Sequence, residues 1–249
     1  MGNKQKMNRK GIMAIVLSVS ILLVSCGTYK AQKQESLLNM PQLGSIVKAR
    51  GGLLYKASEQ IGMPKLTEPL KLHVQELPFN DQSYGAYSDY ILSSGKVNSI
   101  AYTDSLRYRP KYLRLQLRDR IALKELLNSD LNSGIRSYLE KEADHALVVS
   151  LDVTLSDNGI DELSGTEHVF LQPDAYGILH LLLVNGPHKK QMAFSEVQVF
   201  DYRTVSFCWG EDRYHNKQVE NLVSDTKKCP KGTHRNAAKV SADKSYLKF

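Results

Sequence analysis

Two groups of side chains in this sequence have the types and spacing that could bind a metal ion. The first is a short segment with several oxygen ligands of the kind that Ca²⁺ prefers: Asp157, Asn158, Asp161 and Glu162. The second is a set of histidines on or beside expected strands, which could meet around zinc: His145, His168, His180 and His188. The acidic segment lacks the ligand order of an EF-hand, and the sequence does not place any two of the histidines together. We therefore expect a solvated acidic turn and no bound metal.

Locally encoded catalytic motifs are missing from the chain. The sequence has no GxSxG, HExxH, Walker loop, GxGxxG or CxxC pattern, each of which needs a fixed local spacing for its chemistry. A catalytic site assembled from distant strands would leave no such pattern. The sequence thus favours a non-enzymatic protein without a cofactor, and a hydrolase is kept as an alternative.

The cysteine at position 26 ends an apolar run near the amino terminus. The first ten residues contain Lys4, Lys6, Arg9 and Lys10 and no acidic residue, and an apolar stretch then extends over residues 11–24. A basic segment followed by a short apolar run is typical of a secretory signal. The run is shorter than the roughly 20 residues that a membrane-spanning helix needs. We therefore expect this segment, residues 1–25, to be removed.

Residues Leu23, Val24, Ser25 and Cys26 resemble the lipobox of bacterial lipoproteins. The resemblance implies that the Cys26 thiol receives a diacylglycerol, that the signal is cleaved before Cys26, and that the new amino terminus is acylated, for example with palmitate. Two or more acyl chains hold a protein stably on a bilayer, whereas one chain binds only marginally. An ordinary signal peptide and an uncleaved anchor are the alternatives.

Residues 26–40 are expected to form a lipidated tether with an average reach of about 20 Å, because the segment 27–36 is polar and has no periodic apolar pattern. No acidic residue follows Cys26 directly. In lipoproteins of the outer-membrane type, this absence implies sorting to the outer membrane with the protein facing the periplasm. The inner membrane and the cell surface are alternatives.

The two other cysteines are Cys208 and Cys229. An even pair in an exported protein favours a disulfide, because the compartment outside the cytoplasm is oxidising. Such a bridge would stabilise the fold by about 3 kcal/mol in the chain-entropy description. Unpaired thiols and a catalytic cysteine are the alternatives.

Charge is distributed unevenly, with 33 basic against 26 acidic residues in the whole chain. The excess of basic residues lies in the signal segment and after Asp225, so the pI of about 9.1 does not indicate nucleic-acid binding. The basic segment 230–249 lacks an apolar pattern and is expected to be a disordered tail.

Apolar periodicity predicts a mainly antiparallel α+β domain over residues 41–229. Alternating or continuous apolar runs indicate strands at 70–77, 112–118, 147–155, 168–172, 178–184, 191–200 and 204–209. A helical pair is expected near 119–143, with Asp119 as a helix cap. Residues 36–62 give a weak helical signal, and residues 201–203 are expected to connect two strands of a hairpin. The alternative fold is a two-sheet β-sandwich with the helical pair as an insertion.

Aromatic and cationic residues are interleaved before and within one expected strand. The set is Tyr102, Arg107, Tyr108, Arg109, Tyr112 and Arg114. Rings beside cations suit the recognition of a glycan, an anionic polymer or a partner chain, and they also occur as simple packing at a sheet edge. We therefore expect a non-enzymatic accessory subunit, held at the bilayer through acylated Cys26, that binds another envelope protein. The alternatives are a glycan or peptidoglycan binder and a hydrolase of envelope polymers.

Overall fold

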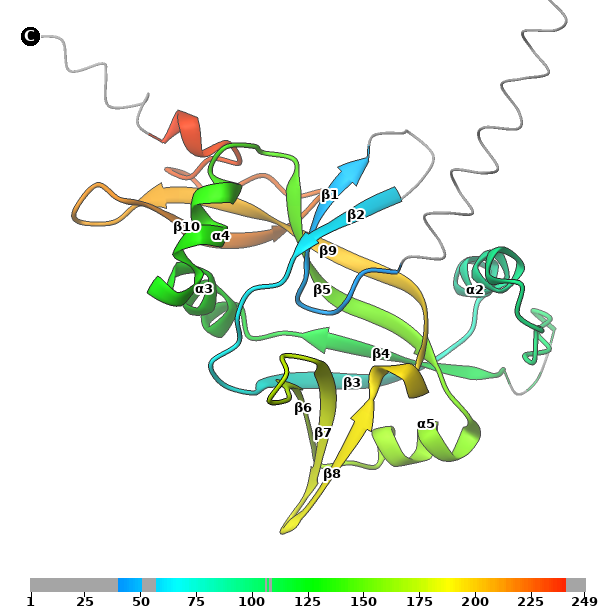
Figure 1. Cartoon of the computed structure of the whole chain (residues 1–249). Helices are drawn as coiled ribbons and strands as arrows, with labels where there is room; N and C mark the ends of the chain where they lie inside the picture. Colours follow the sequence, from blue (N-terminus) through cyan, green and yellow to red (C-terminus); the bar gives the residue numbers. More distant parts are fainter. Residues whose placement is uncertain (1–39, 51–56, 106, 108, 241–249) are drawn as a thin grey trace, which may run out of the picture.

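The computed structural model describes residues 40–50, 57–105, 107 and 109–240 (Figure 1). These residues form a sheet with the strand order β10-β9-β5-β4-β3-β6-β7-β8, with β1 beside β5 and β2 beside β1. The strands are β1 (Ile46–Arg50), β2 (Ala57–Gly62), β3 (Leu70–Pro78), β4 (Lys111–Leu117), β5 (His145–Thr154), β6 (His168–Pro173), β7 (Leu179–Asn185), β8 (His188–Ala193), β9 (Gln198–Glu211) and β10 (Lys217–Ser224). The helices are α2 (Asp81–Ser94), α3 (Arg120–Asn128), α4 (Ser133–Leu139) and α5 (Asp157–Ser164).

All the pairings between these strands are antiparallel, which confirms the expected mainly antiparallel α+β class. The described strands belong to one strongly curled sheet rather than to two stacked sheets. The sandwich alternative is therefore not the architecture of the described residues.

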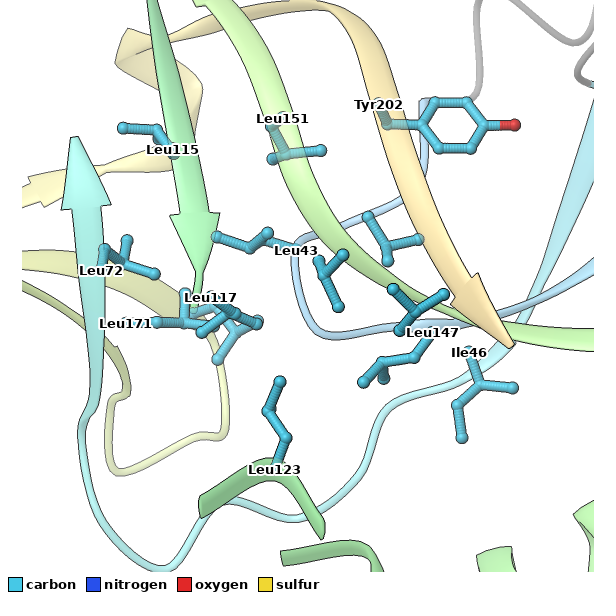
Figure 2. Packing of buried hydrophobic residues seen from close by; sticks show 14 of the residues in the cluster. Leu43, Ile46, Leu72, Leu115, Leu117, Leu123, Leu147, Leu151, Leu171 and Tyr202 are labelled. Atoms are coloured by element: carbon cyan, nitrogen blue, oxygen red, sulfur yellow. The ribbon is translucent and has the colours of Figure 1, made fainter. Parts of the chain in front are cut away.

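The main apolar core lies on one face of this sheet. On β4, the side chains of Leu113, Leu115 and Leu117 are buried together because alternate residues of a strand point to the same face. Leu151 on β5 and Leu43, from the segment before β1, meet them in the same cluster (Figure 2). The alternation in the sequence thus correctly predicts which face of β4 is buried.

The helical pair expected near 119–143 is confirmed as α3 and α4, with a short 3₁₀ turn, Asp130–Asn132, between them. The carboxylate of Asp119 accepts hydrogen bonds from the backbone N–H groups of Ile121 and Ala122 at 3.0 and 2.9 Å, as an N-cap does. At the other end of α3, the Asn128 amide exchanges two hydrogen bonds with the backbone of Val219 on β10. This contact fixes α3 along the edge strand.

Three expectations about local structure are wrong. Part of the weakly helical segment 36–62 forms the hairpin strands β1 and β2, because β1 finds a partner in β5 as well as in β2. Residues 201–203 do not turn but lie inside the 14-residue strand β9. The acidic segment at 157–162 is not a turn, since Ser156 caps the helix α5 there. Strand β10 was not expected at all.

The basic carboxyl-terminal segment also differs from the expected disordered tail over residues 230–240. His234 forms a two-way backbone bridge with Trp209 on β9, with N–O distances of 2.7 and 3.0 Å. Arg235 donates hydrogen bonds to the carbonyl oxygens of Asp225 and Lys227, and Ala237 and Val240 are buried in the main core. Backbone and arginine hydrogen bonds together with two buried apolar side chains thus dock the segment, although its sequence has no apolar periodicity. Residues 241–249 lie outside the described residues.

The disulfide between Cys208 and Cys229 is present in the structure, with the Cα atoms 5.6 Å apart. It joins β9 to the chain just before the docked segment. Cys26 and residues 26–39 of the expected tether lie outside the described residues. Within the described part of the chain, no helix combines the length and the apolar character needed to cross a bilayer.

Candidate binding site beside helix α2

Helix α2 packs on the sheet face opposite the main core and builds a second apolar cluster there. The helix starts at Asn80, whose side chain and that of Ser83 satisfy each other's backbone N–H groups as a capping box. The buried members of the cluster are Phe79, Tyr87, Tyr90, Ile91, Tyr112 and Phe200. The sheet contributes Tyr112 from β4 and Phe200 from β9, so α2 is held by rings from the two strands on either side of β5.

A charged network lies next to this aromatic cluster on the same sheet face. Arg114 on β4 donates to both carboxylate oxygens of Asp152 on β5, at 2.7 and 2.9 Å. Arg203 on β9 donates to the same carboxylate at 3.0 Å, and Arg114 also donates to the Tyr112 hydroxyl at 3.1 Å. The Asp152 side chain is only 2 % exposed, so it depends on these two arginines for its partners.

The charges of this network bind each other rather than solvent. The hydrogen bond to Asp152 is the main cause that raises the pKa of Arg114 above its ordinary value. Burial raises the pKa of the Tyr112 hydroxyl. Both groups therefore keep their protons, and the network fastens three adjacent strands under α2.

A second set of contacts lies on the outer side of α2. The rings of Tyr84 and Tyr102 are 4.9 Å apart, and the Tyr102 hydroxyl lies 3.0 Å from a carboxylate oxygen of Asp81. Arg109 binds Asp104 at 2.7 Å, and Asp104 is itself 3.3 Å from the Tyr102 hydroxyl. Partial desolvation and the contact with Asp81 raise the pKa of Tyr102. These bonds order the long connection between α2 and β4.

The six aromatic and cationic residues singled out in the sequence fall into separate places. Tyr112 and Arg114 lie in the sheet, where they touch each other and Asp152. Tyr102 and Arg109 meet through Asp104 in the connection between α2 and β4. The remaining two are Arg107, which is exposed in the same connection, and Tyr108, which lies outside the described residues.

A cleft of about 360 Å³ opens next to this connection. One wall is the start of the connection, the second is the end of β5 with the turn into α5, and the third is the segment before β9. The lining residues are Lys96, Ser99, Ile100, Thr154, Leu155, Ser156, Ser195, Glu196, Val197 and Gln198. Hydroxyl and amide groups predominate, which suits a ligand with many hydrogen-bonding groups, such as a peptide or a sugar, better than an apolar small molecule.

The side chains around this cleft are partly held by bonds within the protein. The Lys96 ammonium donates to the Tyr90 hydroxyl at 3.1 Å, and Thr154 donates to the Gln198 amide oxygen at 3.2 Å. Glu196 accepts from the backbone N–H of Ala193 at 2.9 Å. Lys96, Thr154, Gln198 and Glu196 are thus held in position before a ligand arrives, which lowers the entropy that these side chains lose on binding.

The candidate metal ligands of the sequence are spread over several elements. Asp157, Asn158, Asp161 and Glu162 lie on α5, where Glu162 binds Lys190 at 2.5 Å. Of the histidines, His145 and His180 are buried on β5 and β7, whereas His168 and His188 are exposed at the starts of β6 and β8. Glu162 and His188 also border a smaller hollow of about 220 Å³.

A further group of potential ligands, not expected from the sequence, lies around His145. Glu142, Asp144 and His145 bring their ligand atoms within 4.8 Å of one another. The ammonium group of Lys48 already lies against both carboxylates, with a bond to Glu142 and a distance of 3.5 Å to Asp144. This cluster therefore serves as an ion-pair tie between β1 and the start of β5.

Helix α2 and the cleft were not expected from the sequence. The signal that could have located the helix is the spacing of Tyr84, Tyr87, Tyr90 and Ile91 after the capping residue Asn80. The cleft combines three segments that are far apart along the chain, so no local pattern indicates it.

Comparisons of the chain with protein-family models, with curated proteins and with solved structures found no match.

Proposed function

We propose that the protein is a lipoprotein of the bacterial envelope whose folded domain acts as a non-enzymatic binding subunit facing the periplasm. The observation that carries this proposal is the leader, in which a basic segment, an apolar run of lipoprotein length and the sequence Leu23-Val24-Ser25-Cys26 follow in order. The Cys208–Cys229 disulfide supports export, because disulfides persist in oxidising compartments. We place the anchored protein at the outer membrane.

The binding role is supported by the chemistry of the cleft beside α2. Its walls present serine and threonine hydroxyls and the Gln198 amide, which can exchange hydrogen bonds with a peptide backbone. The neighbouring arginines Arg114 and Arg109 are occupied by Asp152 and Asp104. We propose that the ligand is a segment of another envelope protein, and that acylation of Cys26 raises the local concentration of the domain near that partner.

A glycan is the second candidate for the ligand of this cleft. Sugars are recognised by hydroxyl and amide groups together with aromatic rings. Tyr102 lies on the same connection as Ser99 and Ile100, and its ring is 4.9 Å from that of Tyr84 on α2. A protein segment and a glycan differ in the products that a crosslinking experiment yields.

Photocrosslinking in intact cells tests the binding role. A photoreactive amino acid at Ser99 or Ser195 in the cleft should give a discrete crosslinked product, whereas the same group at exposed Tyr176 should not. A product that is sensitive to protease indicates a protein partner, and one that is sensitive to a peptidoglycan hydrolase indicates the glycan. Equal products from the cleft and from position 176 would contradict the proposed site.

Removing the acylated thiol tests the anchor. We expect Cys26→Ser to abolish incorporation of labelled palmitate and to release the protein from membranes, because the serine hydroxyl is not a substrate for the thioether linkage. Thermal stability should stay unchanged, because Cys26 contributes to none of the contacts among the described residues, the first of which is Met40. Palmitate labelling and a carbonate wash measure these effects. Ser25→Ala, which keeps a small residue before the cysteine, is the matched control, and a Cys26→Ser variant that stays bound would refute the lipoprotein proposal.

A further inference from the structure

Two large apolar side chains are exposed where α2 ends. Leu92, in the last turn of the helix, is 82 % exposed, and Val97, just beyond it, is 88 % exposed. Gly95 ends the helix in the left-handed conformation, with φ at 64°, and the Lys96 N–H bonds back to the Ile91 carbonyl. This cap keeps Val97 at the end of the helix that also carries Leu92.

The start of the described chain lies next to the same helix. The side chain of Met40 packs against both apolar clusters, and the smaller cluster contains Tyr87, Tyr90 and Ile91 of α2. Only 14 positions separate Cys26 from Met40. A coil of that length spans about 20 Å on average. An acylated Cys26 would thus keep the bilayer close to the part of the domain that α2 occupies.

Polar and aromatic residues of α2 and of the connection after it fit the headgroup region of a bilayer. Tyr84 and Tyr102 each have a ring that is partly exposed and a hydroxyl that is hydrogen-bonded, and tyrosine is enriched at membrane interfaces. Charges over residues 81–111 nearly cancel, with basic Lys96, Arg107, Arg109 and Lys111 against acidic Asp81, Asp89 and Asp104. Contact through this surface should therefore depend on apolar burial and only weakly on salt.

We propose that the end of α2 and the connection after it, with Leu92 and Val97 inserted, form the surface by which the anchored domain lies on the lipid bilayer. This inference rests on the proposed acylation of Cys26. Lys96, Ser99 and Ile100 of the same connection line the cleft. The cleft consequently opens beside the headgroups, and the ligand that it binds is presented close to the membrane surface.

The other strongly exposed apolar residues provide a control. Tyr214 is 67 % exposed in the connection between β9 and β10, which lies at the opposite end of the molecule from α2 (Figure 1). A residue there should stay in water while α2 is on the bilayer. Position 214 is exposed, as positions 92 and 97 are, so one reagent can label all three.

The test uses the full acylated protein in vesicles of phosphatidylethanolamine and phosphatidylglycerol. Leu92→Cys, Val97→Cys and Tyr214→Cys are each labelled with an environment-sensitive fluorophore, and brominated lipids then serve as quenchers. We expect a several-fold larger loss of fluorescence at positions 92 and 97 than at position 214. The difference should persist when the salt concentration is raised.

The outcomes separate this inference from the proposed anchor. If the protein floats with the vesicles but the three labels are quenched equally, the membrane surface is wrong while the lipoprotein proposal stands. If the labels at 92 and 97 are shielded from water-soluble quenchers only after an envelope extract is added, a protein covers this surface and the inference is also overturned. If the wild type does not float, or Cys26→Ser floats equally well, the anchor itself is wrong and the inference falls with it.

Discussion

Replacing Asp152 with alanine is expected to lower the free energy of unfolding by about 3–5 kcal/mol. The carboxylate of Asp152 neutralises Arg114, whose side chain is only 18 % exposed. Without this carboxylate, the guanidinium charge of Arg114 would remain beneath α2, and of the partners described above it would keep only the Tyr112 hydroxyl. Arg203 is 40 % exposed and can turn toward water, so it should contribute less to the loss. Urea denaturation followed by circular dichroism measures the change.

Two further variants show whether the unpaired charge is the cause of that loss. Asp104→Ala removes the partner of Arg109 in a pair whose carboxylate side chain is 67 % exposed, and this should cost no more than about 1 kcal/mol. The double variant Arg114→Met with Asp152→Leu removes both charges and should recover most of the stability. The explanation fails if Asp152→Ala costs no more than Asp104→Ala, or if the double variant is as unstable as Asp152→Ala.

Removing the disulfide should have an effect of similar size. We expect the double variant Cys208→Ala and Cys229→Ala to lose about 3 kcal/mol, because the bridge spans 21 positions and restricts the unfolded chain. For a domain of this size the loss corresponds to a melting temperature lower by roughly 6–12 °C. Scanning calorimetry of the oxidised wild type and of the variant measures the difference.

Reduction of the wild type provides an independent check on the bridge. The reduced protein should melt close to the double variant, whereas a reducing agent should leave the melting temperature of the variant itself unchanged. The Cys26→Ser protein, which also lacks one thiol, should melt like the wild type, because position 26 precedes the folded residues. A double variant as stable as the oxidised wild type would mean that the packing and hydrogen bonds of residues 234–240 hold the carboxyl-terminal segment without the bridge.

Strands with clear alternation and a capped helix were the predictable parts of the fold. Leu113, Leu115 and Leu117 indicate both the strand β4 and its buried face, and Asp119 marks the start of α3. At β9 the same reasoning fails, since Asp201, Tyr202 and Arg203 have the chemistry of a turn. In the structure these residues pair with Asp152, Leu151 and Ser150 of β5, respectively, so a neighbouring strand 50 residues away overrides the local preference.

The candidate site was less predictable than the fold. Arg114 and Tyr112 were expected to belong to an interaction surface. In the structure they bond to each other, and the partner that engages Arg114, Asp152, lies on another strand. Helix α2 was not expected because Gly85 in its first turns and the tyrosines on its buried face have low or only moderate helix propensity. The pairing of Cys208 with Cys229 was expected because an even number of cysteines in an exported protein favours a disulfide. The structure contains this bridge. The lipobox, the anchor and the partner stay predictions.

The central position of β5 has a consequence for how the chain folds during synthesis. Its hydrogen-bonding partners β1 and β4 precede it, and β9 follows it by about 50 residues. A ribosome would release β1 and β4 well before the strand that joins them, and β5 would then keep an open edge until β9 is made. Pairing between such distant segments is slow, on the scale of milliseconds to seconds for β-rich domains. The sheet therefore cannot be completed around β5 until residues 198–211 have been made, and until then the open edge of β5 is exposed to chaperones and proteases.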